Sequence, residues 1–279
     1  MILVTGATGN VGRELVPLLA ATGRPVRAFV RDKAKMHAVG GCIECVEGDL
    51  DRPETLATAM RDIDSVYIVS PLTPQVSNVV AAAKAAGVRC IVKQSTIEAD
   101  RSLGPGKWHR EQELLIEDSG MEWTFLRPTL MMSNLIQWWG DTVRRQGRVY
   151  FPGGNGKAVP VDPRDIALLA RAVLTQPGNA GQTYNVTGPE PLSAREMVHI
   201  LSRVVGKRIR YVRIPLFVAA MAMRRFGATR ELTDAIKETF RAWERNEYDY
   251  VSDAVERVTR RKPRSFEEWC RDHRSSFTA

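Results

Sequence analysis

Three glycines near the start of the chain have the spacing of a phosphate-binding loop. Gly6, Gly9 and Gly12 lie in VTGATGNVG, between a run of β-branched residues and a segment with apolar residues at helical spacing. In such a turn, backbone N–H groups and the positive end of a helix face a diphosphate, and glycine lets the backbone approach it closely. The pattern GxxGxxG therefore predicts a dinucleotide site. We expect it to include Gly6, Thr8, Gly9, Asn10, Val11 and Gly12.

A second feature bears on which dinucleotide would bind. The sequence AFVRD places Arg31 at the end of the second expected strand, with Asp32 directly after it. A carboxylate at this point bonds the ribose 2′-OH of NAD, whereas an arginine pairs with the 2′-phosphate of NADP. We expect Asp32 to cap the following helix and Lys35 to add positive charge, so Arg31 favours NADP(H) over NAD(H). The alternative is that Arg31 is simply solvated.

Two further segments follow expected strands and would lie at the same edge of a sheet. Asp49 and Leu50 come after the third strand, near the expected adenine, and Ser70 and Pro71 come after the fourth, along the expected adenosine groove. Ligands bind at the carboxyl ends of the strands in open parallel sheets. All four could equally be ordinary turn residues.

The elements that must position these residues alternate between short β-branched runs and helical patterns, which predicts a doubly wound parallel sheet in an α/β fold. Helices are expected around residues 10–21, 79–86 and 111–118, and strands at 2–5, 26–30, 43–47, 65–69, 90–93 and 123–126.

After residue 128 the alternation becomes less regular. A Gly-rich loop at 151–156, a helix at about 165–174 and a strand at 183–186 precede helices that start near Ser193, Pro215 and Arg230. Ser193 and Glu196 form the sequence pattern of a capping box. We expect residues 1–150 to form the nucleotide-binding core. Residues 151–279 should form mainly a smaller α/β lobe over the carboxyl edge of the sheet, with some elements returning to the core.

Composition argues against several other classes of protein. The net charge of +8 comes from scattered basic residues without interleaved aromatic residues, so we expect no nucleic-acid partner. The longest apolar run, 215–223, is too short to cross a bilayer, and we expect a cytoplasmic protein without a membrane partner. Cys42 and Cys45 form a single CxxC within or beside an expected strand, and the histidines at 37, 199 and 273 lack metal-ligand spacing. We therefore expect reduced thiols and no metal.

Several segments in order give the chain a family resemblance. VYIVSPLTP, IVKQST, GMEWTFLRPT, VDPRDIA, YNVTGPEPLS and PRSFEEW follow the glycine loop, and together they span nearly the whole sequence. The chain resembles the NmrA-like, atypical short-chain dehydrogenase/reductase family. The resemblance implies a Rossmann fold with a small C-terminal lobe, in a family of NADPH-dependent quinone, azo-dye and triphenylmethane reductases, imine reductases and non-catalytic redox sensors.

The catalytic Tyr-xxx-Lys pair of ordinary short-chain dehydrogenases is absent, because none of the six tyrosines has a lysine four residues later. By the resemblance, Ser95 and Thr96 lie beside the nicotinamide and His109 occupies the place of a proton donor, so Thr96 and His109 are the catalytic candidates. We expect His109 to titrate near neutrality, with Glu113 either orienting its ring or forming a solvated pair with it. The alternative is that His109 is an ordinary surface histidine in the first turn of its helix. Lys93 is expected to point away into a neighbouring helix.

The residues after the sixth expected strand would line the rest of the site. Pro128 and Thr129 would flank the nicotinamide, while Arg127 is expected to form a structural ion pair. The acceptor pocket is expected to include Met131, Asn134, Trp138 and Phe151, with Met132 and Trp139 nearby. The alternative is that these Met and aromatic side chains are ordinary core.

Hydride transfer to a quinone, azo or iminium group needs little more than orientation and a proton, so it tolerates a missing tyrosine. The sequence therefore favours an NADPH-dependent reductase of a small aromatic or conjugated acceptor, acting as a monomer or homodimer. Two alternatives are a non-catalytic NADP(H) sensor that signals to a protein partner, and an isomerase or cyclase that binds no nucleotide.

Overall fold

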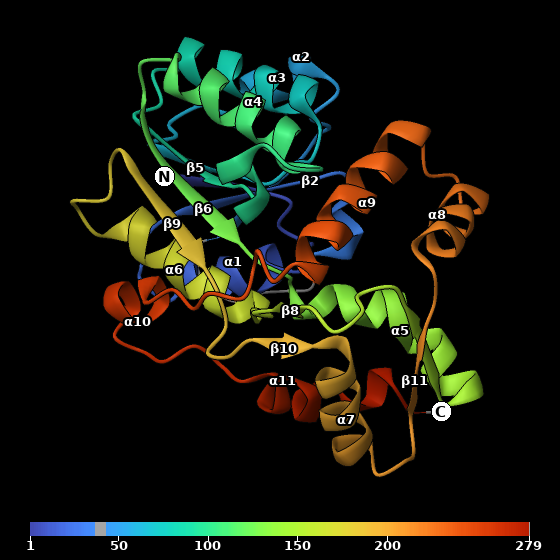
Figure 1. The fold of residues 1–279 in the computed structure, drawn as a ribbon. Helices are drawn as coiled ribbons and strands as arrows, with labels where there is room; N and C mark the ends of the chain where they lie inside the picture. Colours follow the sequence, from blue (N-terminus) through green and yellow to red (C-terminus); the bar gives the residue numbers. More distant parts are fainter. Residues whose placement is uncertain (37–42, 279) are drawn as a thin grey trace. The chain divides into compact units, whose positions relative to one another are not determined.

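The computed structural model describes residues 1–36 and 43–278, which form two compact units (Figure 1). Unit 1 contains residues 1–100, 106–127 and 163–185, and unit 2 contains 101–105, 128–162 and 186–279. The first long segment of unit 2 therefore begins at residue 128, whereas the second lobe was expected to begin at residue 151. Residues 163–185 then return to unit 1, where they supply a helix and most of a strand.

Unit 1 carries a seven-stranded sheet in the order β3-β2-β1-β4-β5-β6-β9. Neighbouring strands from β3 to β6 pair in parallel. This confirms the predicted Rossmann-type α/β fold. The strands are β1 (Ile2–Thr5), β2 (Val26–Val30), β3 (Ile43–Glu47), β4 (Ser65–Ile68), β5 (Cys90–Gln94), β6 (Glu122–Pro128) and β9 (Gln182–Val186).

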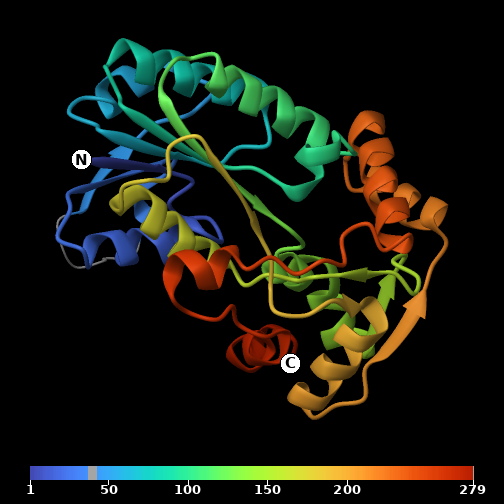
Figure 2. The same ribbon diagram turned by 60° about the vertical axis from the view of Figure 1, so that its left-hand side comes forward.

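Helices cover both faces of this sheet, as Figures 1 and 2 show from two directions. On one face lie α2 (Pro53–Ala59), α3 (Thr73–Ala85) and α4 (Gly106–Glu117), and on the other lie α1 (Gly12–Ala20) and α6 (Pro163–Thr175). Two 3₁₀ turns, η1 (Lys33–Lys35) and η2 (Ile97–Arg101), follow β2 and β5. Helix α3 begins six residues before the expected start at Val79, because Pro74 is accommodated in its first turn, where a missing N–H costs nothing.

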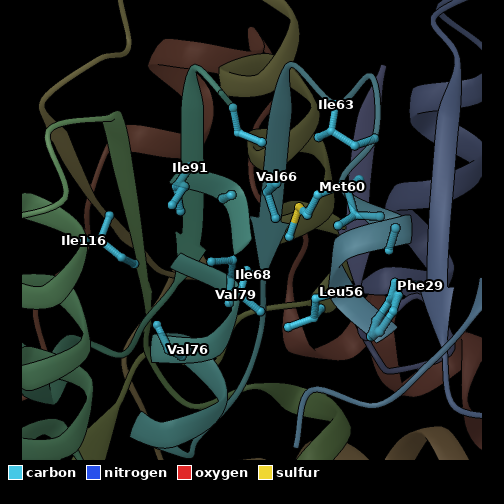
Figure 3. Close-up of a cluster of buried hydrophobic side chains, with 14 of the residues drawn as sticks. Phe29, Leu56, Met60, Ile63, Val66, Ile68, Val76, Val79, Ile91 and Ile116 are labelled. Carbon is cyan, nitrogen blue, oxygen red and sulfur yellow. The ribbon is translucent and has the colours of Figure 1, made fainter. Parts of the chain in front are cut away.

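The core between the sheet and the α2–α4 layer is continuous and apolar (Figure 3). Val66, Ile68 and Ile91 project from β4 and β5 against Leu56 of α2 and Val79 of α3. Each of these side chains is buried, and burial of one such side chain contributes roughly 1.5–3 kcal/mol. This packing fixes the helices relative to the strands and so fixes the loops at the carboxyl edge of the sheet.

The strand order reverses beside β1, since β2 and β3 lie to one side and β4 to the other. Thr5, the last residue of β1, bonds β4 here: its hydroxyl donates to the Tyr67 carbonyl at 3.1 Å and accepts from the Val69 N–H at 3.0 Å. Ligands in open α/β sheets bind at such a reversal, outside the carboxyl ends of the strands. The glycine loop leaves the sheet at this point.

Unit 2 is built from short strands and helices, and its Ser193 capping box is present as predicted. Two two-stranded sheets pair β10 with β8 antiparallel and β11 with β7 in parallel. Its elements are α5 (Met132–Gln146), β7 (Arg148–Phe151), β8 (Lys157–Ala158), β10 (Leu192–Ser193), α7 (Ala194–Val205), β11 (Arg210–Arg213), α8 (Leu216–Arg225), α9 (Arg230–Glu244), α10 (Ala254–Thr259), α11 (Phe266–Asp272) and η3 (Arg274–Ser276).

Candidate functional site

The glycine loop has a tight backbone geometry that larger residues would disrupt. Gly6 has a φ of +60°, and its carbonyl accepts a hydrogen bond from the Gly9 N–H at 2.9 Å. A Cβ on Gly12 would lie 2.1 Å from the Gly6 carbonyl oxygen, and a Cβ on Gly6 would lie 2.4 Å from Val69 Cγ1. Glycine is therefore required at both ends of the turn, where the loop packs against itself and against the end of β4.

Helix α1 begins directly after this loop without a side-chain cap. Val11 is the N-cap residue and makes no side-chain hydrogen bond to the helix, while the Asn10 amide oxygen accepts from Arg13 at 3.0 Å. Thr8 and Gly9 are exposed. The start of α1 therefore has no side-chain cap, and the exposed loop before it includes the Cβ-free Gly9, which fits the diphosphate of a dinucleotide.

At the end of β2, Arg31 is exposed and Asp32 has the expected capping role. The Asp32 carboxylate accepts a hydrogen bond from the Ala34 N–H at 2.9 Å and caps η1. Lys35 lies 3.9 Å from the same carboxylate. Because Asp32 is engaged with its own turn, Arg31 is the more available of the two for a ligand at this strand end.

The other residues predicted on the adenosine side are held in turns. The Asp49 carboxylate accepts from the Asp51 N–H at 3.1 Å, and the Leu50 carbonyl accepts from Asn78 at 2.8 Å. Ser70 is buried, and its hydroxyl accepts from the Leu72 N–H at 3.0 Å. Pro71 is exposed. All four lie after β3 or β4 as expected, and the contacts of Ser70 are those of a turn residue.

Beside the end of β5, Glu113 does not have either arrangement expected from the sequence. It is fully buried, and its carboxylate accepts from Arg127 at 2.7 and 3.0 Å, from Ser95 at 2.6 Å and from Arg110 at 3.1 Å. Burial alone would raise the pKa of Glu113, but the hydrogen bonds from Arg127 and Ser95 keep it below the ordinary value. The predictions that Glu113 orients His109 or forms a solvated pair with it are therefore wrong, because Arg127 binds this carboxylate.

The ion pair between Glu113 and Arg127 also involves neighbouring residues. Arg127 forms a structural ion pair as predicted, and it also bonds Asp100 at 2.9 Å. The Ser95 hydroxyl donates its proton to Glu113 at 2.6 Å. Thr96, one residue further on, is partly exposed, and its hydroxyl donates to the Glu98 carboxylate.

His109 contacts a buried lysine that was not predicted to be part of the site. Lys93 is fully buried in β5, and its ammonium lies 3.3 Å from His109 Nδ1 and donates to the Gln94 carbonyl at 2.8 Å. Lys93 does point toward a neighbouring helix, as expected, but that helix is α4 and the contact is His109. The available signal was a charged residue that directly follows three apolar residues in an expected strand.

The electrostatics of this pair correct the expected titration. Burial lowers the pKa of His109 to about 3, with a further contribution from the Lys93 charge. Burial also lowers the pKa of Lys93 to about 7, although Glu113 acts in the opposite direction. The prediction that His109 titrates near neutrality is therefore wrong, and in this pair the group that titrates near neutrality is Lys93.

Pro128 and Thr129 end β6 and enter unit 2, where both are buried. The Thr129 hydroxyl donates to the Val159 carbonyl, and the Thr129 N–H donates to Val186 at 3.0 Å. These contacts attach the end of β6 to two other segments of unit 2. They assign Thr129 a structural role that the sequence did not indicate.

The predicted pocket residues of unit 2 include part of an aromatic cluster. Phe151 packs against Trp138, Trp139, Phe240 and Trp243, with ring centroids 5.1–5.8 Å apart. Trp139 is fully buried core, as is Met132, whereas Trp138 is 45% exposed and stacks on Phe151 with an interplanar angle of 26°. Met131 and Asn134 are partly exposed at the start of α5. Phe240 and Trp243 of α9 were missed because they lie about 90 residues further along the chain.

The described residues give no support for a metal or a membrane span. Within residues 1–36 and 43–278, no group of three His, Cys, Asp or Glu side chains could hold a metal ion. In the same ranges, no helix is long and apolar enough to cross a membrane. Cys45, Cys90 and Cys270 are free thiols, while Cys42 and His37 lie outside the described residues.

Comparison with known proteins gives the family. Residues 6–177 match the NAD(P)H-binding family. Over its full length the chain is 39% identical to an NAD(P)H azoreductase from Xenophilus azovorans, and all of that protein is covered.

Two solved structures share the fold over almost the whole chain. The NADPH-dependent quinone oxidoreductase of Escherichia coli, complexed with NADPH, has a TM-score of 0.84 at 25% identity and covers 97% of this chain and 98% of its own. The triphenylmethane reductase of a Citrobacter species, complexed with NADP(H), has a TM-score of 0.82 at 25% identity and covers 98% of this chain and 99% of its own. This chain therefore belongs to the NAD(P)H-binding family, within the NmrA-like, atypical short-chain dehydrogenase/reductases.

Proposed function

We propose that this protein is an NADPH-dependent reductase that transfers hydride to a quinone, azo or other conjugated, dye-like acceptor without a Tyr-xxx-Lys pair. The observation that carries the proposal lies within unit 1. The glycine loop after β1 and the Lys93–His109 pair beside the end of β5 occupy the same carboxyl edge of the parallel sheet, with only β4 between the two strands. The carboxyl edge of the sheet thus carries both the proposed phosphate-binding loop and a candidate proton donor.

The residues at this edge match the parts of a dinucleotide. The loop from Gly6 to Gly12 and the uncapped start of α1 would hold the diphosphate. Arg31 would pair with the 2′-phosphate of NADP, and Asp49, Leu50, Ser70 and Pro71 would border the adenosine. NADP(H) is thus the proposed cofactor, with NAD(H) the weaker ligand.

The chemistry asked of the protein is modest. Reduced nicotinamide supplies the hydride when bound, and the protein must orient the acceptor, exclude water and deliver a proton where the product needs one. His109, at the first turn of α4, is the proposed proton donor, acting as a neutral imidazole. Thr96 is the second catalytic candidate, with Ser95, Pro128 and Thr129 proposed beside the nicotinamide.

The aromatic cluster of unit 2 supports a flat acceptor. Aromatic rings favour offset-stacked partners, and the exposed part of Trp138 would offer such a face, with Phe151 fixing the ring from behind. We propose Met131, Asn134, Trp138 and Phe151 as residues that contact the acceptor. The relatives named for azo, quinone and triphenylmethane reduction indicate the acceptor classes to test.

Two further expectations, on the cellular compartment and on the partners, belong to this proposal. The free thiols at Cys45, Cys90 and Cys270 are compatible with a reducing compartment, and we propose a cytoplasmic protein. Its partners are then small aromatic molecules, with no role for nucleic acid.

The test is a spectrophotometric assay of NADPH oxidation with an azo dye, a quinone and a triphenylmethane dye, together with calorimetric titration of NADPH and NADH. We expect NADPH to bind more tightly than NADH and at least one acceptor to be reduced catalytically. Tight NADPH binding without turnover of any acceptor would indicate the sensor instead. Absence of binding heat with either nucleotide would leave the isomerase or cyclase alternative.

A further inference from the structure

Lys93 is an unusual residue for its position. In the register of the sheet it lies between Ile68 of β4 and Phe125 of β6, on the face that carries the apolar core. Its side chain is fully buried, and within residues 1–36 and 43–278 no carboxylate forms an ion pair with its ammonium. A buried unpaired cation is costly, so an apolar residue would pack better here. Its ammonium instead donates to the Gln94 carbonyl and contacts the His109 ring.

That contact sets the protonation of the histidine ring. An ammonium group has three hydrogen-bond donors and no acceptor, so His109 Nδ1, 3.3 Å from Lys93 Nζ, must act as the acceptor when Lys93 is charged. The neutral imidazole then carries its proton on Nε2. Lys93 therefore holds His109 in the tautomer that presents one N–H donor on the side of the ring away from the lysine.

We propose that Lys93 is a positioning and proton-supplying residue that acts through His109 in the reduction of acceptors whose products need a proton. This inference rests on the proposed reductase function. When hydride adds to one nitrogen of an azo group, the N=N π bond breaks and the electron pair moves to the second nitrogen. His109 Nε2–H gives its proton to that nitrogen, Nδ1 takes a proton from Lys93, and the lysine is left neutral. One hydride and one proton thus convert the azo group to a hydrazine. Solvent later protonates His109 Nε2, and Nδ1 returns its proton to Lys93, which restores both groups.

The charged groups around the pair favour this arrangement. On α4, Glu113 faces Lys93, but its carboxylate is held by Arg127 of β6, by Arg110 and by Ser95. The Arg127 guanidinium is also bonded to Asp100 of η2. The neighbouring carboxylates are therefore neutralised by arginines, which leaves His109 as the side chain that accepts from Lys93.

The proposal separates acceptors by chemistry. Reduction of an azo group creates a strongly basic nitrogen anion, which must be protonated as hydride arrives. A triphenylmethane dye is a carbocation, and hydride alone converts it to the neutral leuco product. Loss of the proton supply should therefore slow reduction of the azo dye and leave reduction of the triphenylmethane dye unchanged, although NADPH would supply the hydride to both.

The experiment compares Lys93→Met with the matched surface variant Lys84→Met, on an exposed lysine in the last turn of α3. We expect Lys93→Met to lower kcat for an azobenzene dye without an ortho-hydroxyl group by about 10²–10⁴-fold, the usual contribution of a positioned proton donor. Its kcat for crystal violet and its Kd for NADPH should stay within about threefold of wild type. Lys84→Met should match wild type with both dyes.

Each other outcome overturns a specific part of the argument. Equal loss with both dyes, or no loss with the azo dye, would overturn the role of Lys93 and leave the reductase assignment intact. A wild-type protein that reduces neither dye nor quinone would overturn the proposed function itself, and proton delivery with it.

A spectroscopic readout without nucleotide tests the same contact. Nitrogen-15 NMR of the histidine rings should show His109 with an unprotonated Nδ1 and a protonated Nε2 in wild type at pH 6, and a mixture of tautomers in Lys93→Met. A protonated Nδ1 in the wild-type protein would overturn the proposed orientation.

Discussion

The Glu113 carboxylate is bound bidentately by Arg127, with N–O distances of 2.7 and 3.0 Å, and it lies in the interior between α4 and β6. This ion pair connects the helix that carries His109 to the strand that leads into unit 2. It therefore fixes the position of α4 relative to the sheet and, through it, the position of His109.

Removal of the Glu113 charge should destabilise the fold. Glu113→Gln keeps the shape of the side chain but leaves the buried part of Arg127 without its main counterion, which typically costs about 3–5 kcal/mol. Urea unfolding at pH 7 measures the effect. Glu117→Gln, at a partly exposed carboxylate that bonds Arg110, is the matched control and should cost under about 1 kcal/mol. Equal losses in the two variants would contradict the structural role of Glu113.

The partners of Glu113 show what sequence reasoning could and could not supply. The separation of four residues correctly puts His109 and Glu113 on one face of a helix, so a local pair was the reasonable expectation. Arg127 lies 14 residues further on, in strand β6, and no local spacing encodes that pairing. The three-dimensional contact replaced the local one because a buried carboxylate needs a strong counterion, which a neutral histidine does not supply.

Lys93→Met should make the protein more stable, and the gain should depend on pH. The pKa of Lys93 is about 7 in the folded protein, below its ordinary value of 10.5. Between these pH values the unfolded chain binds a proton that the folded protein lacks, so the contribution of Lys93 to wild-type stability rises with pH and is lowest below pH 7.

The free energy of unfolding of Lys93→Met should therefore exceed that of wild type by about 1–3 kcal/mol at pH 6, and by less at pH 9. The gain is limited because the hydrogen bonds lost with the ammonium offset part of the relieved desolvation. Urea unfolding at both pH values checks this, with Lys84→Met expected to show no pH-dependent difference. A variant less stable than wild type at pH 6 would mean that Lys93 holds the structure together, contrary to the proposal.

The fold itself was largely predictable, since each strand from β1 to β6 begins and ends within two residues of the expected limits. In β1, β2, β4 and β5 every residue is buried, and most residues are β-branched or apolar, so composition and burial agree there. The edge strand β3 was predicted from its alternation instead, and none of its residues is buried. The short strands β7 and β11 of unit 2 were not predicted. Arg148–Phe151 and Arg210–Arg213 are only four residues long and each contains arginine, and they become strands by pairing with each other across about 60 residues.

The pH dependence of turnover should differ between acceptors. With the azobenzene dye, wild-type kcat should fall above an apparent pKa near 7, because loss of the Lys93 proton removes the supply to His109. With crystal violet at saturating NADPH, no such fall in kcat is expected. With the azo dye, kcat of Lys93→Met should show no fall near pH 7. Steady-state rates from pH 5.5 to 9 measure both profiles. The same fall with both dyes would instead assign the titration to hydride transfer or cofactor binding.

Arg31 should determine the preference between the two pyridine nucleotides. Arg31→Ala removes the guanidinium expected at the 2′-phosphate, so NADPH affinity should fall about 10–100-fold, the range that corresponds to loss of a charge-assisted bond worth 1.5–3 kcal/mol. NADH affinity should change less than threefold, as calorimetry can measure. Arg61→Ala is a suitable control because Arg61 is exposed in the segment between α2 and β4, at the opposite edge of the sheet. Equal losses for both nucleotides would contradict the assignment of NADP.

The neighbouring tryptophans of α5 should separate acceptor binding from stability. Trp138 is 45% exposed and stacks on Phe151, whereas Trp139 is fully buried against the same ring. Trp138→Ala should raise KM for bulky dyes about 5–20-fold, with thermal stability nearly unchanged, since loss of one aromatic stack is worth roughly 0.5–1.5 kcal/mol. Trp139→Ala should instead cost about 3–5 kcal/mol in urea unfolding, because it leaves a cavity in the core. If Trp138→Ala left KM unchanged for every dye tested, the exposed face of this cluster would have no part in binding the acceptor, and the aromatic residues of unit 2 would serve packing alone.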